Sequence, residues 1–284
     1  MSFTERAFVF PCIGETLLGI ATIPERPRAT GVLLVVGGPQ YRVGSHRQFL
    51  LLSRALSDVG YPAMRFDYRG MGDSTGELRD FEVVNDDIAA AICAFQANCP
   101  ELTRIVLWGL CDAASASLLY WDATRDTRVG GLVLLNPWVR SEASLAKTHI
   151  KHYYGQRLLQ AEFWRKLLTG NLGIGPALSG FVKNWMRARQ TPGWTSFEDE
   201  LPFQKRMMRA LKDYPGHVLL VLSGDDYTAK EFIEAIQADS PGAQALESSR
   251  LTRIDVVGAD HTFSDAKWRL AVQDATTAWM GNSW

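Results

Sequence analysis

The sequence predicts an α/β protein with a mostly parallel, twisted sheet, helices on both faces and an inserted helical cap. Short apolar runs, typical of buried strands, alternate with helical patterns over residues 31–135, and the connections between them are short. The alternation stops at 141–210, an aromatic, basic stretch without a strand pattern, and resumes at 217. We therefore expect an α/β core made of residues 1–140 and 211–284, with the helical cap at 141–210.

The individual elements are expected from hydrophobic periodicity and turn residues. Residues 6–11 and 16–23 are predicted to form a hairpin around Ile13-Gly14-Glu15. The later strands are predicted at 31–36, 61–68, 104–108, 129–135, 217–222 and 250–257. The helices are predicted at 46–59, 80–98, 112–122, 228–238 and 264–280.

Composition excludes several classes of protein. The chain has 284 residues, 46% of them hydrophobic, and a formal net charge of −1, so nothing suggests binding to nucleic acid. No apolar run approaches the roughly 20 residues of a membrane helix, and the N-terminus does not resemble a signal peptide. The four cysteines form no CxxC pair and no cluster with zinc spacing, which favours free thiols in the cytoplasm and no metal or cofactor. The sequence does not indicate an oligomeric state.

The most informative stretch is Gly109-Leu110-Cys111-Asp112-Ala113, which joins an apolar strand to a small-residue helix. Such a turn is typical of a nucleophile elbow, with Cys111 at the tip and small residues at the flanking positions, Gly109 and Ala113. The N-terminus of the new helix would favour a thiolate, the nucleophilic form of cysteine. This stretch alone fits a buried core cysteine equally well.

Other polar residues follow neighbouring strands, and the carboxyl ends of parallel strands collect reactive groups at one edge. Asp225 or Asp226 follows the strand at 217–222, and His261 follows the last strand. His261 would be the base, an aspartate would orient its ring, and the N–H groups of Gly38 and Asp112 would bind an oxyanion.

Two further motifs resemble the α/β-hydrolase superfamily. They are an oxyanion loop, Val36-Gly37-Gly38-Pro39-Gln40, and a glycine-rich turn, Phe66-Asp67-Tyr68-Arg69-Gly70-Met71-Gly72-Asp73-Ser74. Four segments also resemble, more narrowly, the exosortase A system-associated hydrolases of type 1, encoded near exopolysaccharide genes: Gly109–Ala114, His152–Tyr154, Ser223–Phe232 and Asp260–Ser264.

The resemblance implies a Cys-His-Asp triad made of Cys111, His261 and Asp226, since the acid usually stands in a Gly-x-Asp arrangement. Cysteine in place of serine and Ala113 in place of the second elbow glycine are departures from the superfamily pattern.

The predicted function is an esterase or thioesterase that acts on a small or medium acyl group through an acyl-thioester intermediate. An acyltransferase with the same triad remains an alternative, as does a non-catalytic or redox-sensing protein of this fold. His149 and His152 have the spacing of a metal pair, but the sequence offers no third ligand, so they are expected on the cap surface or in its pocket.

Overall fold

The computed structural model describes residues 2–38, 40–140 and 201–284. The chain divides into two units, one formed by Met1–Val139 with Pro202–Trp284 and the other by Arg140–Leu201. The description below concerns the first unit. Most of the predicted cap, with His149 and His152, lies outside the described residues, and its last described part enters α7 (Phe203–Asp213).

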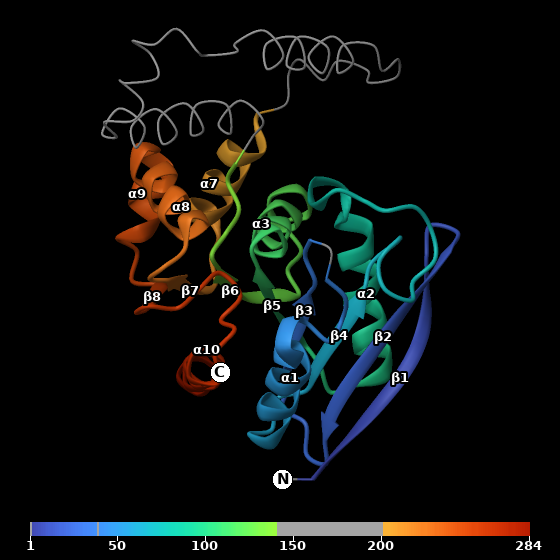
Figure 1. The fold of residues 1–284 in the computed structure, drawn as a ribbon. Coiled ribbons are helices and arrows are strands. Elements are labelled where there is room, and N and C mark those ends of the chain that lie inside the picture. The colour runs from blue at the N-terminus through green and yellow to red at the C-terminus, as the bar shows by residue number, and fades with distance from the viewer. Residues whose placement is uncertain (1, 39, 141–200) are drawn as a thin grey trace, which may run out of the picture. The chain divides into compact units, whose positions relative to one another are not determined.

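The first unit contains an eight-stranded sheet in the order β1-β2-β4-β3-β5-β6-β7-β8 (Figure 1). β1 pairs antiparallel with β2, and β2 pairs antiparallel with β4, whereas all later pairings are parallel. The strands are β1 (Phe3–Cys12), β2 (Glu15–Pro24), β3 (Thr30–Val35), β4 (Ala63–Asp67), β5 (Arg104–Leu110), β6 (Val129–Leu135), β7 (His217–Ser223) and β8 (Leu251–Val256). The predicted hairpin and the mostly parallel sheet are confirmed.

Helices cover both faces of this sheet. One hydrophobic cluster joins the sheet to α1 and α10, and a second, larger one joins it to α2, α3, α7 and α8. The remaining helical bounds are α1 (Gln48–Asp58), α2 (Asn85–Asn98), α3 (Asp112–Thr124), α8 (Tyr227–Ala238), α9 (Ser240–Leu246) and α10 (Ala266–Ser283), with short 3-10 turns η1 (Ser45–Arg47) and η2 (Phe81–Val83).

Two helical elements differ from the prediction. The helix expected at 80–98 is split, because Asp80 caps a separate 3-10 turn by accepting from the Glu82 N–H, and α2 begins only at Asn85. The helix α9 was not predicted, since its seven residues are too few to show a helical period.

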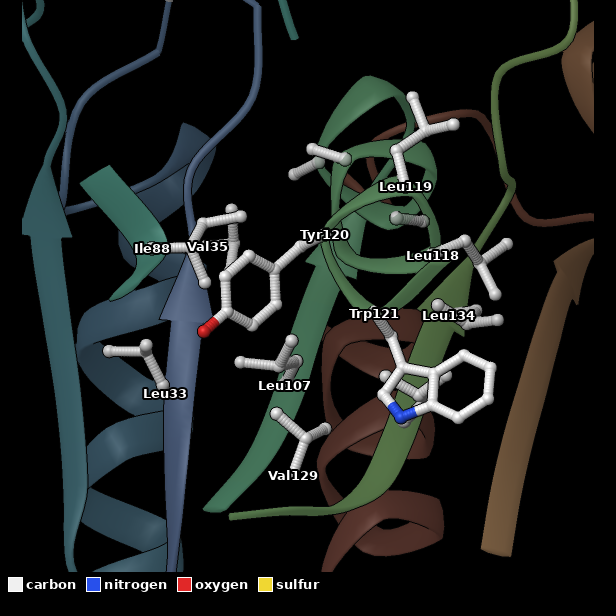
Figure 2. Packing of buried hydrophobic residues seen from close by; sticks show 14 of the residues in the cluster. Leu33, Val35, Ile88, Leu107, Leu118, Leu119, Tyr120, Trp121, Val129 and Leu134 are labelled. Atoms are coloured by element: carbon white, nitrogen blue, oxygen red, sulfur yellow. The ribbon is translucent and has the colours of Figure 1, made fainter. Parts of the chain in front are cut away.

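Alternate side chains of β5 contribute to the two hydrophobic clusters on opposite faces of the sheet. Leu107 faces the larger cluster, with Leu134 of β6 and Tyr120 of α3 (Figure 2). Its neighbour Trp108 faces the opposite cluster. There its ring packs edge-on against the ring of Phe49 of α1, with 5.5 Å between the two ring centroids. Because successive side chains point to opposite faces, an unbroken apolar strand is the expected sequence for a sheet covered on both sides.

Candidate active site

Cys111 stands between β5 and α3 in a strained backbone conformation, with φ 62° and ψ −124°. A non-glycine residue at positive φ is uncommon and costs roughly 1–3 kcal/mol, so the surrounding structure must hold it there. The close approach of β5 and α3 explains the small residues: a Cβ on Gly109 would lie 2.5 Å from the Ala113 carbonyl carbon. The predicted elbow geometry is therefore present around Cys111.

The end of β6 fixes the backbone of this elbow. The Cys111 N–H donates to the Leu135 carbonyl at 2.8 Å, and the Cys111 carbonyl accepts from the Trp138 N–H at 3.3 Å. Ser115, one turn into α3, donates through Oγ to the Trp138 carbonyl at 2.7 Å. Buried backbone groups paired in this way leave the elbow few alternative conformations.

His261 lies beside Cys111 and is oriented by an aspartate. Its Nδ1 is 2.8 Å from Oδ2 of Asp226, and both His261 and Cys111 line the same cavity. Asp226 follows β7 as the N-cap of α8, where it accepts from the N–H groups of Thr228 and Ala229. Asp225, the alternative acid, is exposed and its N–H bonds to the Ala259 carbonyl. The structure thus places Asp226, and not Asp225, against the histidine.

The ionisation of the pair follows from these contacts. The hydrogen bond to Asp226, and then the interaction with Cys111, raise the pKa of His261 from 6.5 to about 10, although burial opposes the rise. Burial alone would raise the pKa of Asp226, but the hydrogen bond and charge of His261 outweigh it and lower that pKa. At neutral pH the pair is therefore an imidazolium beside a carboxylate.

A buried asparagine, absent from the sequence prediction, ties the histidine loop to the sheet. Asn136 follows β6 with φ 44° and is fully buried. Its Nδ2 donates to the His261 carbonyl at 3.1 Å and to Oγ of Ser223 at 2.8 Å, and its Oδ1 accepts from the Ser223 N–H at 2.8 Å. Ser223 Oγ in turn donates to the Asp260 carbonyl at 2.8 Å. An asparagine directly after a buried strand was the only sequence signal for this role.

The predicted oxyanion donors have an unexpected partner. The Gly38 N–H donates to Oδ2 of Asp112 at 2.7 Å, and the Ala113 N–H donates to Oδ1 at 3.0 Å. Gly38 has φ 57°, a conformation that glycine adopts without cost, and a Cβ on Gly37 would lie only 2.0 Å from Oδ1. The Asp112 side chain thus fills the space beside the glycine pair, where the sequence had suggested a role only for the Asp112 N–H.

The Asp112 carboxylate is held in a buried position. Burial raises its pKa, while hydrogen bonds from the N–H groups of Gly38, Ala113 and Asp112 itself lower it, and the nearby Asp80 charge raises it further. The net direction is upward. Burial therefore outweighs three N–H donors and the positive end of α3, which would otherwise favour the charged form.

These groups face one cavity of about 480 Å³. Its walls combine the elbow and the two predicted donors with the aromatic rings of Phe49, Phe81 and Trp138. The remaining lining residues are Gly37, Gln40, Asp80, Leu110 and His261. In the described ranges, no group of three or more His, Cys, Asp or Glu side chains could hold a metal ion. The same ranges include no helix long and apolar enough to cross a membrane.

Comparison with known proteins identifies the family of the chain. A model of the alpha/beta hydrolase family matches residues 32–272. The chain belongs to the alpha/beta hydrolase family. The human Protein ABHD12B is 35% identical to this chain over 80 residues, a match that spans 28% of this chain and 20% of that protein.

Solved structures of other proteins share this fold. The Pyrococcus furiosus esterase Pf2001 has a TM-score of 0.63 at 16% identity, covering 98% of this chain and 94% of the esterase. Est1E from Butyrivibrio proteoclasticus, solved with ferulic acid bound, has a TM-score of 0.62 at 14% identity, covering 98% and 99%. The predicted fold class is confirmed, while the narrower resemblance to exosortase-associated hydrolases stays a prediction.

Proposed function

We propose that this alpha/beta hydrolase cleaves ester or thioester bonds, with Cys111 as nucleophile, His261 as general base and acid, and Asp226 as the residue that orients His261. The observation that carries the proposal is the alignment of three groups. A strained cysteine at the elbow lines the same cavity as His261 and raises the pKa of its ring, and Nδ1 of that ring is bonded to Asp226. Family membership and the esterase neighbours in fold support hydrolytic chemistry of this kind.

The roles follow from the positions of the atoms. Asp226 binds Nδ1 of His261, which leaves Nε2 for the sulfur of Cys111 and later for the leaving group. The thiolate attacks the acyl carbon, the leaving alkoxide or thiolate takes a proton from His261, and an acyl-Cys111 thioester remains. Water, activated by the same histidine, then releases the acid. Thioesters and activated esters suit a sulfur nucleophile better than amides, because the tetrahedral intermediate expels an amine less readily than a thiolate.

Intact-mass detection of the acyl-enzyme tests the proposal. The protein is incubated with a panel of acyl thioesters of increasing chain length and quenched in acid, which slows hydrolysis of the adduct. We expect the mass of one acyl group on the native protein and on Cys93→Ala, which removes an exposed cysteine outside the cavity. The adduct should be absent from Cys111→Ala. An adduct that persists in Cys111→Ala, or no adduct with any donor, would refute the assignment.

Asp226→Asn is the sharpest variant for the acid. Asparagine is isosteric and also a good N-cap, so α8 keeps its first turn while the charge beside Nδ1 is lost. We expect the acylation rate to fall about 10²- to 10⁴-fold. Asp225→Asn, one residue away and exposed, is the matched control, and it should change the rate less than twofold. Equal losses in the two variants would contradict the role given to Asp226.

A further inference from the structure

The Asp112 side chain is not an ordinary helix cap. In α8, α9 and α10 an aspartate at the N-cap accepts from N–H groups two or three residues later. In α3 the N-cap is Cys111, and Asp112 is the first helical residue. Its carboxylate bonds to the next N–H, that of Ala113, and reaches across to the Gly38 N–H after β3. Capping one helix does not require this second contact.

One of these bound N–H groups, that of Gly38, is a group that an acyl oxyanion would need. In this fold the oxyanion is held by the N–H after the nucleophile and by an N–H from the loop after β3. Here they belong to Asp112 and Gly38, and the Gly38 N–H is bonded to the Asp112 carboxylate at 2.7 Å. A tetrahedral oxyanion and a carboxylate cannot share these donors, because two like charges in a buried space repel strongly. The carboxylate must therefore leave before Cys111 can be acylated.

We propose that Asp112 is a specificity-determining residue, whose carboxylate occupies the oxyanion position and yields to acyl groups that carry a cationic hydrogen-bond donor close to the scissile carbonyl. Such a donor would pair with the carboxylate as it is displaced, whereas a plain alkyl chain would leave it buried and unpaired, which is costly. This inference rests on the proposed acyl transfer to Cys111 and names the class of acyl group that the site selects.

The charge of the cavity supports this selection. Asp112 and Asp80 both line it, and the charge of Asp80 acts on Asp112. Among the described lining residues there is no lysine or arginine. The imidazolium of His261 is already paired with Asp226. A cationic acyl group would therefore meet an excess of negative charge next to the elbow.

The acylation step itself balances without a further reactant. The Cys111 thiolate forms a bond to the acyl carbon, and the π electrons of the carbonyl move to its oxygen. That oxygen takes over the N–H groups of Gly38 and Asp112, while the carboxylate turns toward the cation of the substrate. When the intermediate collapses, the thiolate leaving group departs and takes a proton from His261, and the carbonyl is restored.

Two N-acetylcysteamine thioesters of matched shape test the proposal. The butyryl and β-alanyl groups differ only in a terminal methyl or ammonium group. Their acylation rates at Cys111 are measured by intact mass and divided by the rate of alkylation with iodoacetamide. Alkylation depends on the thiolate but not on an oxyanion site, so the ratio isolates that site from changes in thiol reactivity.

We expect the native protein to favour the β-alanyl group at least tenfold. In Asp112→Asn this preference should fall below threefold, and butyryl acylation relative to alkylation should rise about tenfold. Asp80→Asn removes the other carboxylate of the cavity without touching the two donors and should retain most of the preference. Asp112→Ser, which lacks both charge and reach, should behave like Asp112→Asn and provides a second variant if the first does not fold.

The outcomes separate the two proposals. If the native protein is acylated equally by both donors, or if the preference survives in Asp112→Asn and Asp112→Ser, the role of Asp112 is wrong while acyl transfer stands. If iodoacetamide labels Cys111 but neither donor acylates any variant, the proposed function fails and the inference fails with it.

Discussion

Replacing Asn136 with alanine should destabilise the fold and release the histidine loop. The side chain makes three hydrogen bonds, two buried ones to Ser223 and a partly buried one to the His261 carbonyl. Each hydrogen bond is worth about 1 kcal/mol net. The loss is larger for the bond from the Ser223 N–H, because this group would be left buried without a partner. Alanine is also less suited than asparagine to φ 44°, which adds about 1 kcal/mol. We expect a total loss of about 4 kcal/mol.

Urea unfolding followed by circular dichroism measures this loss, and two further variants divide it. Asn136→Gly lacks the amide but adopts positive φ freely, so it should be about 0.5–1 kcal/mol more stable than Asn136→Ala. Asn98→Ala deletes an amide with one local bond, to the Ala94 carbonyl, and should cost less than about 1 kcal/mol. If Asn136→Ala lies within 1 kcal/mol of the native protein, the hydrogen bonds around His261 do not stabilise the fold as inferred.

Three other outcomes are expected. The pKa of His261 is raised from 6.5 to about 10, so its stabilising contribution is complete below pH 6.5 and is lost as the pH rises through 10. The native protein should therefore lose its stability advantage over His261→Gln in that window. Urea unfolding of both proteins across pH 6–11 measures this difference. Gly109→Ala places a Cβ 2.5 Å from the Ala113 backbone, so it should abolish acylation and lower the melting temperature, whereas an unchanged rate would show that the elbow can open. Arg69→Met leaves the Asp87 carboxylate fully buried without its cation, which should cost about 3–5 kcal/mol in urea unfolding.

Much of the fold was predictable because the spacing of apolar residues along the chain indicates which segments are buried strands and which are helices. Four of the later strands, β3, β5, β6 and β7, are mostly apolar runs, and the alternation of strands with helices predicts parallel pairing. What failed was local. The seven residues of α9 are shorter than two helical turns and show no period, and one aspartate, Asp80, was enough to separate a 3-10 turn from α2.

The candidate site was likewise predictable in part: the positions of its residues at strand ends could be predicted, but their side-chain contacts could not. Strand-end position predicted that Cys111, His261 and either Asp225 or Asp226 lie together, since parallel strands end at one edge of the sheet. Side-chain direction could not be read in this way. The sequence shows that an acidic residue follows the nucleophile, but the hydrogen bond from Gly38 to its carboxylate depends on the path of the loop after β3. Long-range contacts of single side chains, including those of Asn136, need the structure.

The charges around the elbow favour cysteine over serine as the nucleophile. A serine would need a neutral histidine as its base, yet the hydrogen bond between His261 and Asp226 raises the pKa of His261 and favours the imidazolium. A cysteine reacts as a thiolate, for which an imidazolium is the natural counter-ion. Cys111→Ser should therefore lose activity on both matched thioesters, because serine cannot form an ion pair with His261. The double variant Cys111→Ser with Asp112→Asn frees the donors but not the base, so it should remain inactive near pH 7 in the same intact-mass assay. Recovery of activity in that double variant would show that Asp112 alone, and not the protonation of His261, opposes a serine nucleophile.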